Sequence, residues 1–147
     1  MADVSFITDR LATGGAIGGL DVAGILALGI THIVDCQAET DDTHEFAGTN
    51  ISVLWDGVPD DGNPQTHGPA WFGPGIEFAL AALAQPHTKV LCHCAAGINR
   101  GPSMAYAVML ALGFNVNDAE NLIRAARPQV GLAYKLEAQA AVPALGY

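Results

Sequence analysis

Hydrophobic residues along this chain occur in blocks that are separated by polar, glycine-rich or proline-rich segments. Short blocks rich in β-branched and apolar side chains predict buried strands over Phe6–Ala12, Thr31–Cys36, Ile51–Trp55 and Lys89–His93. Longer apolar segments with capping or stop signals predict helices over Val22–Leu28, Gly75–Ala84, Pro102–Leu112, Asp118–Ala126 and Tyr134–Ala141. Strands that alternate with helices indicate an α/β fold, a three-layer-like sandwich in which helices flank a central, mainly parallel sheet.

Several helix ends are marked by residues that form caps or that interrupt a helix. Gly29 is expected to end the first helix. Asn117, with Glu120 three residues later, resembles a capping box for the fourth helix, which Pro128 would end. Pro143 is expected to stop the last helix.

One long segment, residues 56–74, carries neither a strand nor a helix signal and reads DGVPDDGNPQTHGPAWFGP. Its Gly, Pro and Asp residues favour turns. Long ordered loops in compact domains often carry functional residues. We therefore expect this loop to contribute to a functional site.

Composition narrows the class of protein. The chain has 147 residues, of which 50% are hydrophobic and 14% charged, and this predicts one folded domain over residues 1–147. The formal net charge is −9 and the six basic residues form no stripe, which argues against a nucleic-acid partner and against an anionic membrane surface. No apolar run approaches the roughly 20 residues that span a bilayer, and MADVSFITDR lacks the pattern of a secretory signal. We expect a cytoplasmic protein.

The cysteines are Cys36, Cys92 and Cys94, and their low, odd number argues against a disulfide scaffold and for a reducing compartment. Cys92, His93 and Cys94 are not expected to bind a metal ion. Strand alternation turns the middle side chain to the opposite face, and no second pair completes four ligands. We expect no metal and no other cofactor.

The segment HCAAGINRGPS, from His93 to Ser103, places a cysteine and an arginine in a loop between a predicted strand and a predicted helix. Such a loop lies at the carboxyl edge of a parallel sheet, where α/β folds bind ligands. Backbone amides and the helix N-terminus favour an anion there, and an arginine can bind two oxygens of one phosphate. The predicted phosphate-binding residues are Ala95, Ala96, Gly97, Ile98, Asn99 and Arg100.

Positive surroundings also favour the thiolate of Cys94, which is the nucleophilic form of a cysteine. A thiolate beneath a bound phosphate can attack the phosphorus and form a covalent intermediate. Cys94 and Arg100 are therefore predicted to share one anion, which Cys94 attacks and Arg100 holds.

His93, Cys94, Gly97 and Arg100 match the signature H-C-x-x-G-x-x-R, and the chain resembles the cysteine-dependent protein tyrosine phosphatases, in their small dual-specificity branch. ITDRLATGG, ITHIVDC and IRAARPQVGL are similar to that branch too, so the resemblance extends over most of the chain. VPDDGNP and R-G-P are similar to segments of the phosphatase of regenerating liver group.

This resemblance implies a dual-specificity-phosphatase-like fold. It also implies hydrolysis of phosphate monoesters through a cysteinyl-phosphate, without a metal. The partner would be a phosphorylated protein or a small phosphate ester, such as a nucleotide or an inositol phosphate.

The leaving group of such a reaction needs a proton, which a carboxylic acid on a mobile loop can supply. Asp60 and Asp61 lie on the long loop and are the two candidates. An alignment on D-x-G-x-P selects Asp60, whereas the double aspartate of the closer group selects Asp61, which we favour from the sequence. Asp56 is a poorer third candidate, and the aspartate that is not the acid would simply form a turn.

Two residues have roles that only the resemblance implies. His93 would brace the loop by hydrogen bonds, and the alternative is an ordinary buried histidine. Cys36 would protect Cys94 by trapping its oxidised form as a disulfide. The alternative for Cys36 is a small core residue.

The sequence departs from the resembled family in one notable way. Most members carry Ser or Thr directly after the arginine, where the hydroxyl stabilises the departing thiolate. Here that position is Gly101, and Ser103 comes two residues later. The departure predicts slow breakdown of the phospho-enzyme, and predicts that Gly101→Ser speeds turnover.

Four functions remain open from the sequence, of which a sulfurtransferase or arsenate reductase fits the central strand and the upstream aspartates less well than the following three. The first is a phosphatase for phosphotyrosine, with phosphoserine or phosphothreonine as further substrates. The second is a small-molecule phosphatase, although the absence of lysine from the loop disfavours a highly phosphorylated inositol lipid. The third is a phosphate-binding module with slow turnover.

Overall fold

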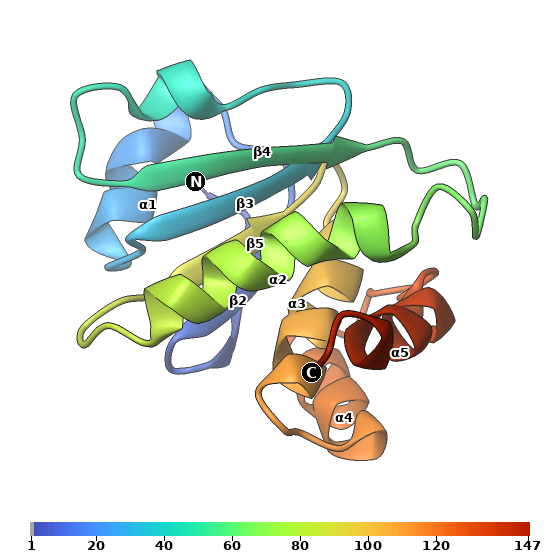
Figure 1. The fold of residues 1–147 in the computed structure, drawn as a ribbon. Coiled ribbons are helices and arrows are strands. Elements are labelled where there is room, and N and C mark those ends of the chain that lie inside the picture. The colour runs from blue at the N-terminus through green and yellow to red at the C-terminus, as the bar shows by residue number, and fades with distance from the viewer. Residues whose placement is uncertain (1) are drawn as a thin grey trace.

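A five-stranded sheet in the order β1-β2-β5-β3-β4 lies at the centre of the computed structural model, which describes residues 2–147 (Figure 1). Four of the strands are parallel to one another, and β1 is antiparallel to β2. The strands are β1 Val4–Thr8, β2 Leu11–Gly14, β3 His32–Gln37, β4 Ser52–Val58 and β5 Val90–His93. The predicted α/β fold with a mainly parallel sheet is confirmed.

Helices cover both faces of the sheet, with α1 on one face and the other four on the opposite face (Figure 1). Because side chains alternate along a strand, Ile33 and Leu91 face the α1 side, whereas Val34 and Cys92 face the larger core beneath α2, α3 and α5. The helices are α1 Val22–Ala27, α2 Pro69–Leu83, α3 Arg100–Ala111, α4 Val116–Ala126 and α5 Lys135–Ala144. None of these helices is long and apolar enough to span a bilayer.

The prediction of a single N-terminal strand was wrong. Phe6–Ala12 was expected to be one strand, but the chain turns at Asp9 and Arg10 and forms the β1–β2 hairpin. Arg10 Nε donates to the Thr88 carbonyl oxygen at 2.9 Å, so the arginine of the turn binds the segment before β5 instead of continuing the strand.

Helix starts were also misplaced. Helix α2 begins at Pro69, where proline fits the first helical position, so the long loop ends earlier than expected and Pro74 lies inside the helix. Helix α3 begins at Arg100 instead of Pro102. The cap of α4 is Asn115, not Asn117, and its side chain accepts the Asp118 amide hydrogen at 2.8 Å.

Helix α5 continues through Pro143, which was expected to stop it. A proline removes one helical hydrogen bond. Here the buried side chains of Ala138, Ala141 and Val142 before Pro143, and the partly buried Leu145 after it, pack into the core. Tertiary packing therefore outweighs the local penalty.

Candidate active site

The loop from Cys94 to Asn99 connects the end of β5 to the start of α3 at the carboxyl edge of the parallel strands, as the sequence predicted. Its carbonyl groups are turned away from the loop centre by three different partners. The Ala95 carbonyl accepts the Ala16 amide hydrogen at 2.9 Å, and the Ile98 carbonyl accepts the Gly131 amide hydrogen at 2.9 Å. Arg127 binds the two carbonyls between them.

This arrangement determines where the amides point. In a planar trans peptide, the N–H of one residue points opposite to the C=O of the residue before it. Because the carbonyls of residues 95–98 point outward, the amide hydrogens of Ala96, Gly97, Ile98 and Asn99 point inward. No hydrogen bond within residues 2–147 uses these four hydrogens, so all four are available as donors to an anion.

Arg127 holds the loop from outside. Its Nε donates to the Gly97 carbonyl at 2.7 Å and its Nη2 to the Ala96 carbonyl at 3.3 Å. A bidentate ion pair with Asp3, with both distances 2.8 Å, fixes the guanidinium and lowers the pKa of the Asp3 carboxyl. The ion pair makes Arg127 a structural residue that supports the loop from outside. Its contact with the loop was not foreseen.

Gly97 occupies a position that no other residue fits. Its φ is +68°, in the left-handed region. A Cβ there would lie 2.4 Å from Arg127 Nη2 and 2.7 Å from the carbonyl carbon of Gly14. The glycine of the motif therefore allows both the turn of the loop and the approach of Arg127.

Arg100 is almost fully buried at the first position of α3, directly after the loop. Its Nη1 and Nη2 donate to the two carboxylate oxygens of Glu39 at 2.6 and 3.1 Å, and Nη1 also donates to the Val58 carbonyl at 2.9 Å. The ion pair lowers the pKa of Glu39. Arg100 Nε is buried without a hydrogen-bond partner among the described residues, so one donor remains for an anion.

Glu39 was missed by the sequence interpretation. It lies in a segment that Asp35 pins at both ends: one carboxylate oxygen accepts the Gln37 amide hydrogen and the other accepts that of Asp42, each at 3.0 Å. Burial raises the pKa of Asp35. Asp35, an aspartate at the end of an apolar strand, is the only signal in the sequence that this segment is held in place.

The bracing contact expected of His93 is present. Its Nδ1 lies 3.3 Å from the Cys94 carbonyl oxygen, and its Nε2 lies 2.6 Å from Asp42 Oδ2, with both side chains fully buried. Nδ1 must donate to the carbonyl, so the histidine connects the nucleophile's own backbone to Asp42.

The ligand atoms of Asp35, Asp42 and His93 lie within 4.8 Å of one another and could hold a metal ion. The 2.6 Å between Nε2 and Oδ2 is a hydrogen-bond distance. Two ligands about 2.0–2.1 Å from a tetrahedral zinc would lie about 3.3 Å apart. The atoms are thus closer together than two ligands of one zinc ion, and we interpret the cluster as a buried His93–Asp42 pair that braces the loop.

The two candidate acids occupy different surroundings. Asp60 faces the loop: its Oδ2 accepts the Asn99 side-chain amide at 3.3 Å, and its Oδ1 accepts the Tyr134 hydroxyl at 2.5 Å. Asp61 turns back on its own segment, where Oδ1 accepts the Asn63 amide hydrogen at 2.9 Å and forms a local turn. The structure therefore favours Asp60, against our preference for Asp61 from the sequence.

Asp56, the third candidate, is partly buried in the core side of β4, where burial raises its pKa to about 7. Its Oδ2 has no hydrogen-bond partner among the described residues. A Cβ on Gly75 of α2 would lie 3.1 Å from this oxygen, so Asp56 faces α2 and not the loop.

Cys36 lies beside Cys94. The parallel register pairs Val34 with Cys92 and Asp35 with His93, so the next residue of each segment is Cys36 and Cys94. Burial, followed by the neighbouring Cys92 and Cys94, raises the pKa of Cys36 well above its ordinary value. The two cysteines follow paired positions of neighbouring strands, and the raised pKa means that the buried thiol of Cys36 is a poor nucleophile.

Gly101 leaves no room for a side chain. A Cβ there would lie 2.8 Å from the His93 Cα and 3.0 Å from the Cys92 carbonyl oxygen. This close approach counts against the expectation that Gly101→Ser speeds turnover, because α3 packs directly on the backbone of β5. The Ser103 hydroxyl accepts the Tyr134 amide hydrogen at 3.3 Å.

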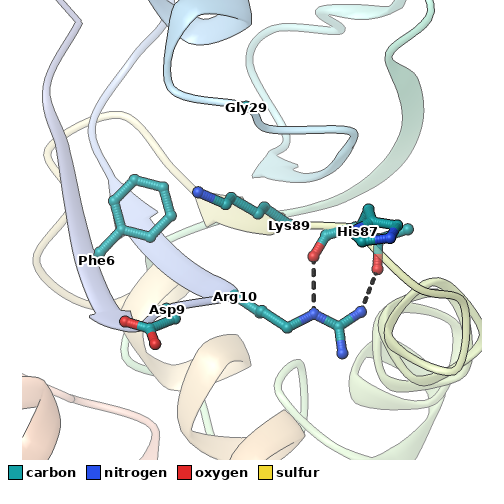
Figure 2. Close-up of a pocket in the computed structure, with 7 residues that line it drawn as sticks. Phe6, Asp9, Arg10, Gly29, His87 and Lys89 are labelled. Carbon is teal, nitrogen blue, oxygen red and sulfur yellow. Dashed lines mark hydrogen bonds between the residues drawn. The ribbon is translucent and has the colours of Figure 1, made fainter.

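A shallow cavity of about 320 Å³ opens at the loop and is lined by Ala38, Glu39, Pro59, Asp60 and Arg100. A larger cavity of about 650 Å³ lies at the other end of the sheet, beside the β1–β2 turn (Figure 2). There Arg10 is occupied by Thr88, and Lys89 points toward the Phe6 ring with its Nζ 5.4 Å from the ring centroid. These side chains diverge, so the phosphate chemistry belongs to the smaller cavity.

Comparisons with known proteins agree with this geometry. A family model described as "Dual specificity phosphatase, catalytic domain" matches residues 19–140. Human "Dual specificity protein phosphatase 13B" is 31% identical over 103 residues, which make up 68% of this chain and 52% of that protein. The chain thus spans about half the length of this curated relative.

Solved structures show the same fold at low identity. Tk-PTP in its active form has 19% identity and a TM-score of 0.78, with 95% of each chain covered. PTPMT1 in complex with PI(5)P has 15% identity and a TM-score of 0.79, covering 97% of this chain and 96% of that one.

Proposed function

This chain belongs to the family of dual-specificity phosphatase catalytic domains, and we propose that it hydrolyses phosphate monoesters through a cysteinyl-phosphate on Cys94. One observation carries the proposal. The loop that begins at Cys94 carries four inward amide hydrogens, and these and the Nε of Arg100 have no acceptor among residues 2–147. Such preorganised donors stabilise the charge that develops on a transferring phosphoryl group.

The reaction needs two steps. The Cys94 thiolate attacks phosphorus, the bond from phosphorus to the leaving oxygen breaks, and the protonated carboxyl of Asp60 gives its proton to that oxygen. A water molecule then attacks phosphorus, passes one proton to the Asp60 carboxylate, and the phosphorus–sulfur bond breaks to restore the thiolate. The products are the free alcohol or phenol and inorganic phosphate.

The rim of the cavity supports a singly phosphorylated protein side chain as the substrate. Glu39 and Asp60 line the opening, and Asp61 lies exposed on the same loop. Arg100 is the only basic residue that lines this cavity, and Glu39 already neutralises part of its charge. Additional phosphate groups near the first would be repelled, which disfavours inositol polyphosphates.

Finer assignments remain predictions. Membership of the phosphatase of regenerating liver group is predicted only from the segments VPDDGNP and R-G-P, whereas the relative reported above is a dual-specificity phosphatase 13B. A cytoplasmic location depends on composition. A small-molecule substrate is the alternative, and a phosphate-binding module with slow turnover is the third possibility, since Gly101 has no hydroxyl and Ser103 comes two residues later, where its hydroxyl accepts the Tyr134 amide hydrogen.

Turnover of p-nitrophenyl phosphate beside phosphotyrosyl, phosphoseryl and nucleotide substrates tests the proposal, with Cys94→Ser as the control. We expect hydrolysis that Cys94→Ser abolishes, highest kcat/KM on phosphopeptides, and a rapid burst of p-nitrophenol before a slower steady state. Equal rates in the parent and in Cys94→Ser would overturn the proposed intermediate. Preference for a nucleotide would favour the small-molecule alternative.

Asp60→Asn is expected to lower kcat/KM for a phosphotyrosyl peptide by about 100-fold, because general acid catalysis contributes about 10² or more. Asp61→Asn is expected to change it less than about 3-fold, since the asparagine retains the turn with Asn63. The pH profile of each variant checks the assignment. A large loss in Asp61→Asn with none in Asp60→Asn would restore the sequence-based preference.

Oxidation is expected to join Cys36 and Cys94. Hydrogen peroxide oxidises the Cys94 thiolate to a sulfenic acid, and the Cys36 sulfur then displaces its hydroxyl as water. Peptide mass mapping after peroxide treatment should show the link, formed faster at higher pH because the pKa of Cys36 is raised. Over-oxidised Cys94 beside an intact Cys36 thiol would contradict this, and Cys36→Ser shows that pattern as a reference.

A further inference from the structure

The carboxylate of Asp60 has two hydrogen-bond donors from opposite sides. The Asn99 side chain, part of the phosphate-binding loop, donates to Oδ2, and the Tyr134 hydroxyl donates to Oδ1. The two oxygens are therefore distinguished: Oδ2 lies toward the loop and Oδ1 lies toward Tyr134.

Tyr134 is suited to this contact because its own position is fixed. It is almost fully buried at the residue before α5, and its hydroxyl accepts the Gly62 amide hydrogen at 3.0 Å while it donates to Asp60. Burial, and then the hydrogen bond with Asp60, raise the pKa of Tyr134 to about 12. The hydroxyl thus keeps its proton at neutral pH and remains a donor.

His67 clamps the same segment. Its ring stacks on Tyr134 with centroids 3.5 Å apart and an interplanar angle of 8°. One ring nitrogen lies 2.8 Å from the Pro59 carbonyl oxygen and the other 2.8 Å from that of Asn63, so the ring bridges both ends of the turn that carries Asp60. The stacked pair holds the turn against the start of α5.

We infer that Tyr134 is a positioning residue that occupies Asp60 Oδ1, so that the proton for the leaving group is carried and returned by Oδ2. The inference rests on the proposed general-acid role of Asp60. In the first step, Oδ2–H gives its proton to the leaving oxygen while Oδ1 keeps its bond from Tyr134. In the second step, Oδ2 receives the proton of the attacking water, and Tyr134 remains unchanged throughout.

The dependence of rate on the leaving group tests the inference. Phenol is a weaker acid than p-nitrophenol, so phenyl phosphate needs the proton more. Tyr134→Phe keeps the ring and its stacking and removes only the hydroxyl. We expect kcat/KM to fall about 10-fold for phenyl phosphate, as for one hydrogen bond to a charged group. For p-nitrophenyl phosphate we expect kcat/KM to fall less than about 3-fold. The ratio of kcat/KM for p-nitrophenyl phosphate to kcat/KM for phenyl phosphate therefore rises in this variant. That ratio does not depend on the fraction of active enzyme.

Tyr106→Phe is the matched control. Tyr106 is also buried, and its hydroxyl accepts one side-chain hydrogen bond, from Gln139 at 2.8 Å, in the core away from the loop. The ratio should equal that of the parent in this variant. A shift in Tyr106→Phe as large as that in Tyr134→Phe would overturn the inference, because it would show a general effect of losing a buried hydroxyl.

A double variant shows whether Tyr134 acts through Asp60. In an Asp60→Asn background, Tyr134→Phe is expected to have no further effect on the ratio, since interacting residues are not additive. If Asp60→Asn alone shifts the ratio but Tyr134→Phe does not, the inference fails and the proposed acid stands. If Asp60→Asn leaves the ratio unchanged, the assignment of the acid fails and the inference fails with it.

Discussion

Arg100→Lys is expected to lower kcat/KM for aryl phosphates by about 10³-fold, a loss typical for removal of an arginine that stabilises a transferring phosphoryl group. The guanidinium binds both oxygens of Glu39 and the Val58 carbonyl, and its Nε is still unpartnered. A lysine keeps the charge but has no planar fork, so it cannot hold Glu39 in this way and also present a fixed donor to the phosphate. Steady-state rates and inhibition by inorganic phosphate measure the two effects.

Arg10→Lys provides the matched control. Arg10 also binds carbonyl groups, those of Thr88 and Gln85, but beside the start of β5, at the opposite end of the sheet. We expect this variant to retain phosphate inhibition and rates within about 2-fold of the parent, as for most changes away from a site. A similar rate for Arg100→Lys and the parent would exclude the guanidinium from phosphate binding.

The central part of this site could be predicted from local sequence. The strand ending at His93, the glycine at position 97 and the arginine at the start of α3 are neighbours in the chain, and each has a local signal. The alternation of strands and helices was enough to predict the parallel sheet, because crossover connections place helices on its faces. These features do not depend on contacts between distant residues.

The residues that were missed act across long separations. Glu39 binds Arg100 across 61 positions and Tyr134 binds Asp60 across 74. Neither has a neighbouring motif that distinguishes it from an ordinary surface glutamate or core tyrosine. Only the folded chain brings these partners together.

The preference for Asp61 failed to match the geometry for a related reason. Two adjacent aspartates give two alignments, and spacing alone does not show which one turns toward the loop. In the structure, Asp61 forms a turn with Asn63, which leaves Asp60 facing Asn99 and Tyr134. Local turn formation by the second aspartate thus orients the first.

Gly101→Ser is expected to destabilise the protein instead of increasing its rate of turnover. The new Cβ would lie 2.8 and 2.9 Å from two backbone atoms of His93 and 3.0 Å from the Cys92 carbonyl oxygen. Backbone atoms of a central strand cannot move as the end of a side chain does, so α3 must shift. Overpacking of this kind costs about 3 kcal/mol, which lowers the Tm by about 10 °C in a domain of this size. Thermal unfolding measures the loss.

Activity should fall together with stability, because a shift of α3 moves Arg100 and the last amides of the loop. Gly68→Ser is the matched control: Gly68 caps α2, and the nearest atom to a Cβ there is 3.8 Å away. Serine is a favourable helix cap, so this variant should be as stable as the parent or slightly more stable. A Gly101→Ser protein with an unchanged Tm and faster breakdown of the phospho-enzyme would show that α3 yields at little cost, and that the missing hydroxyl alone limits turnover.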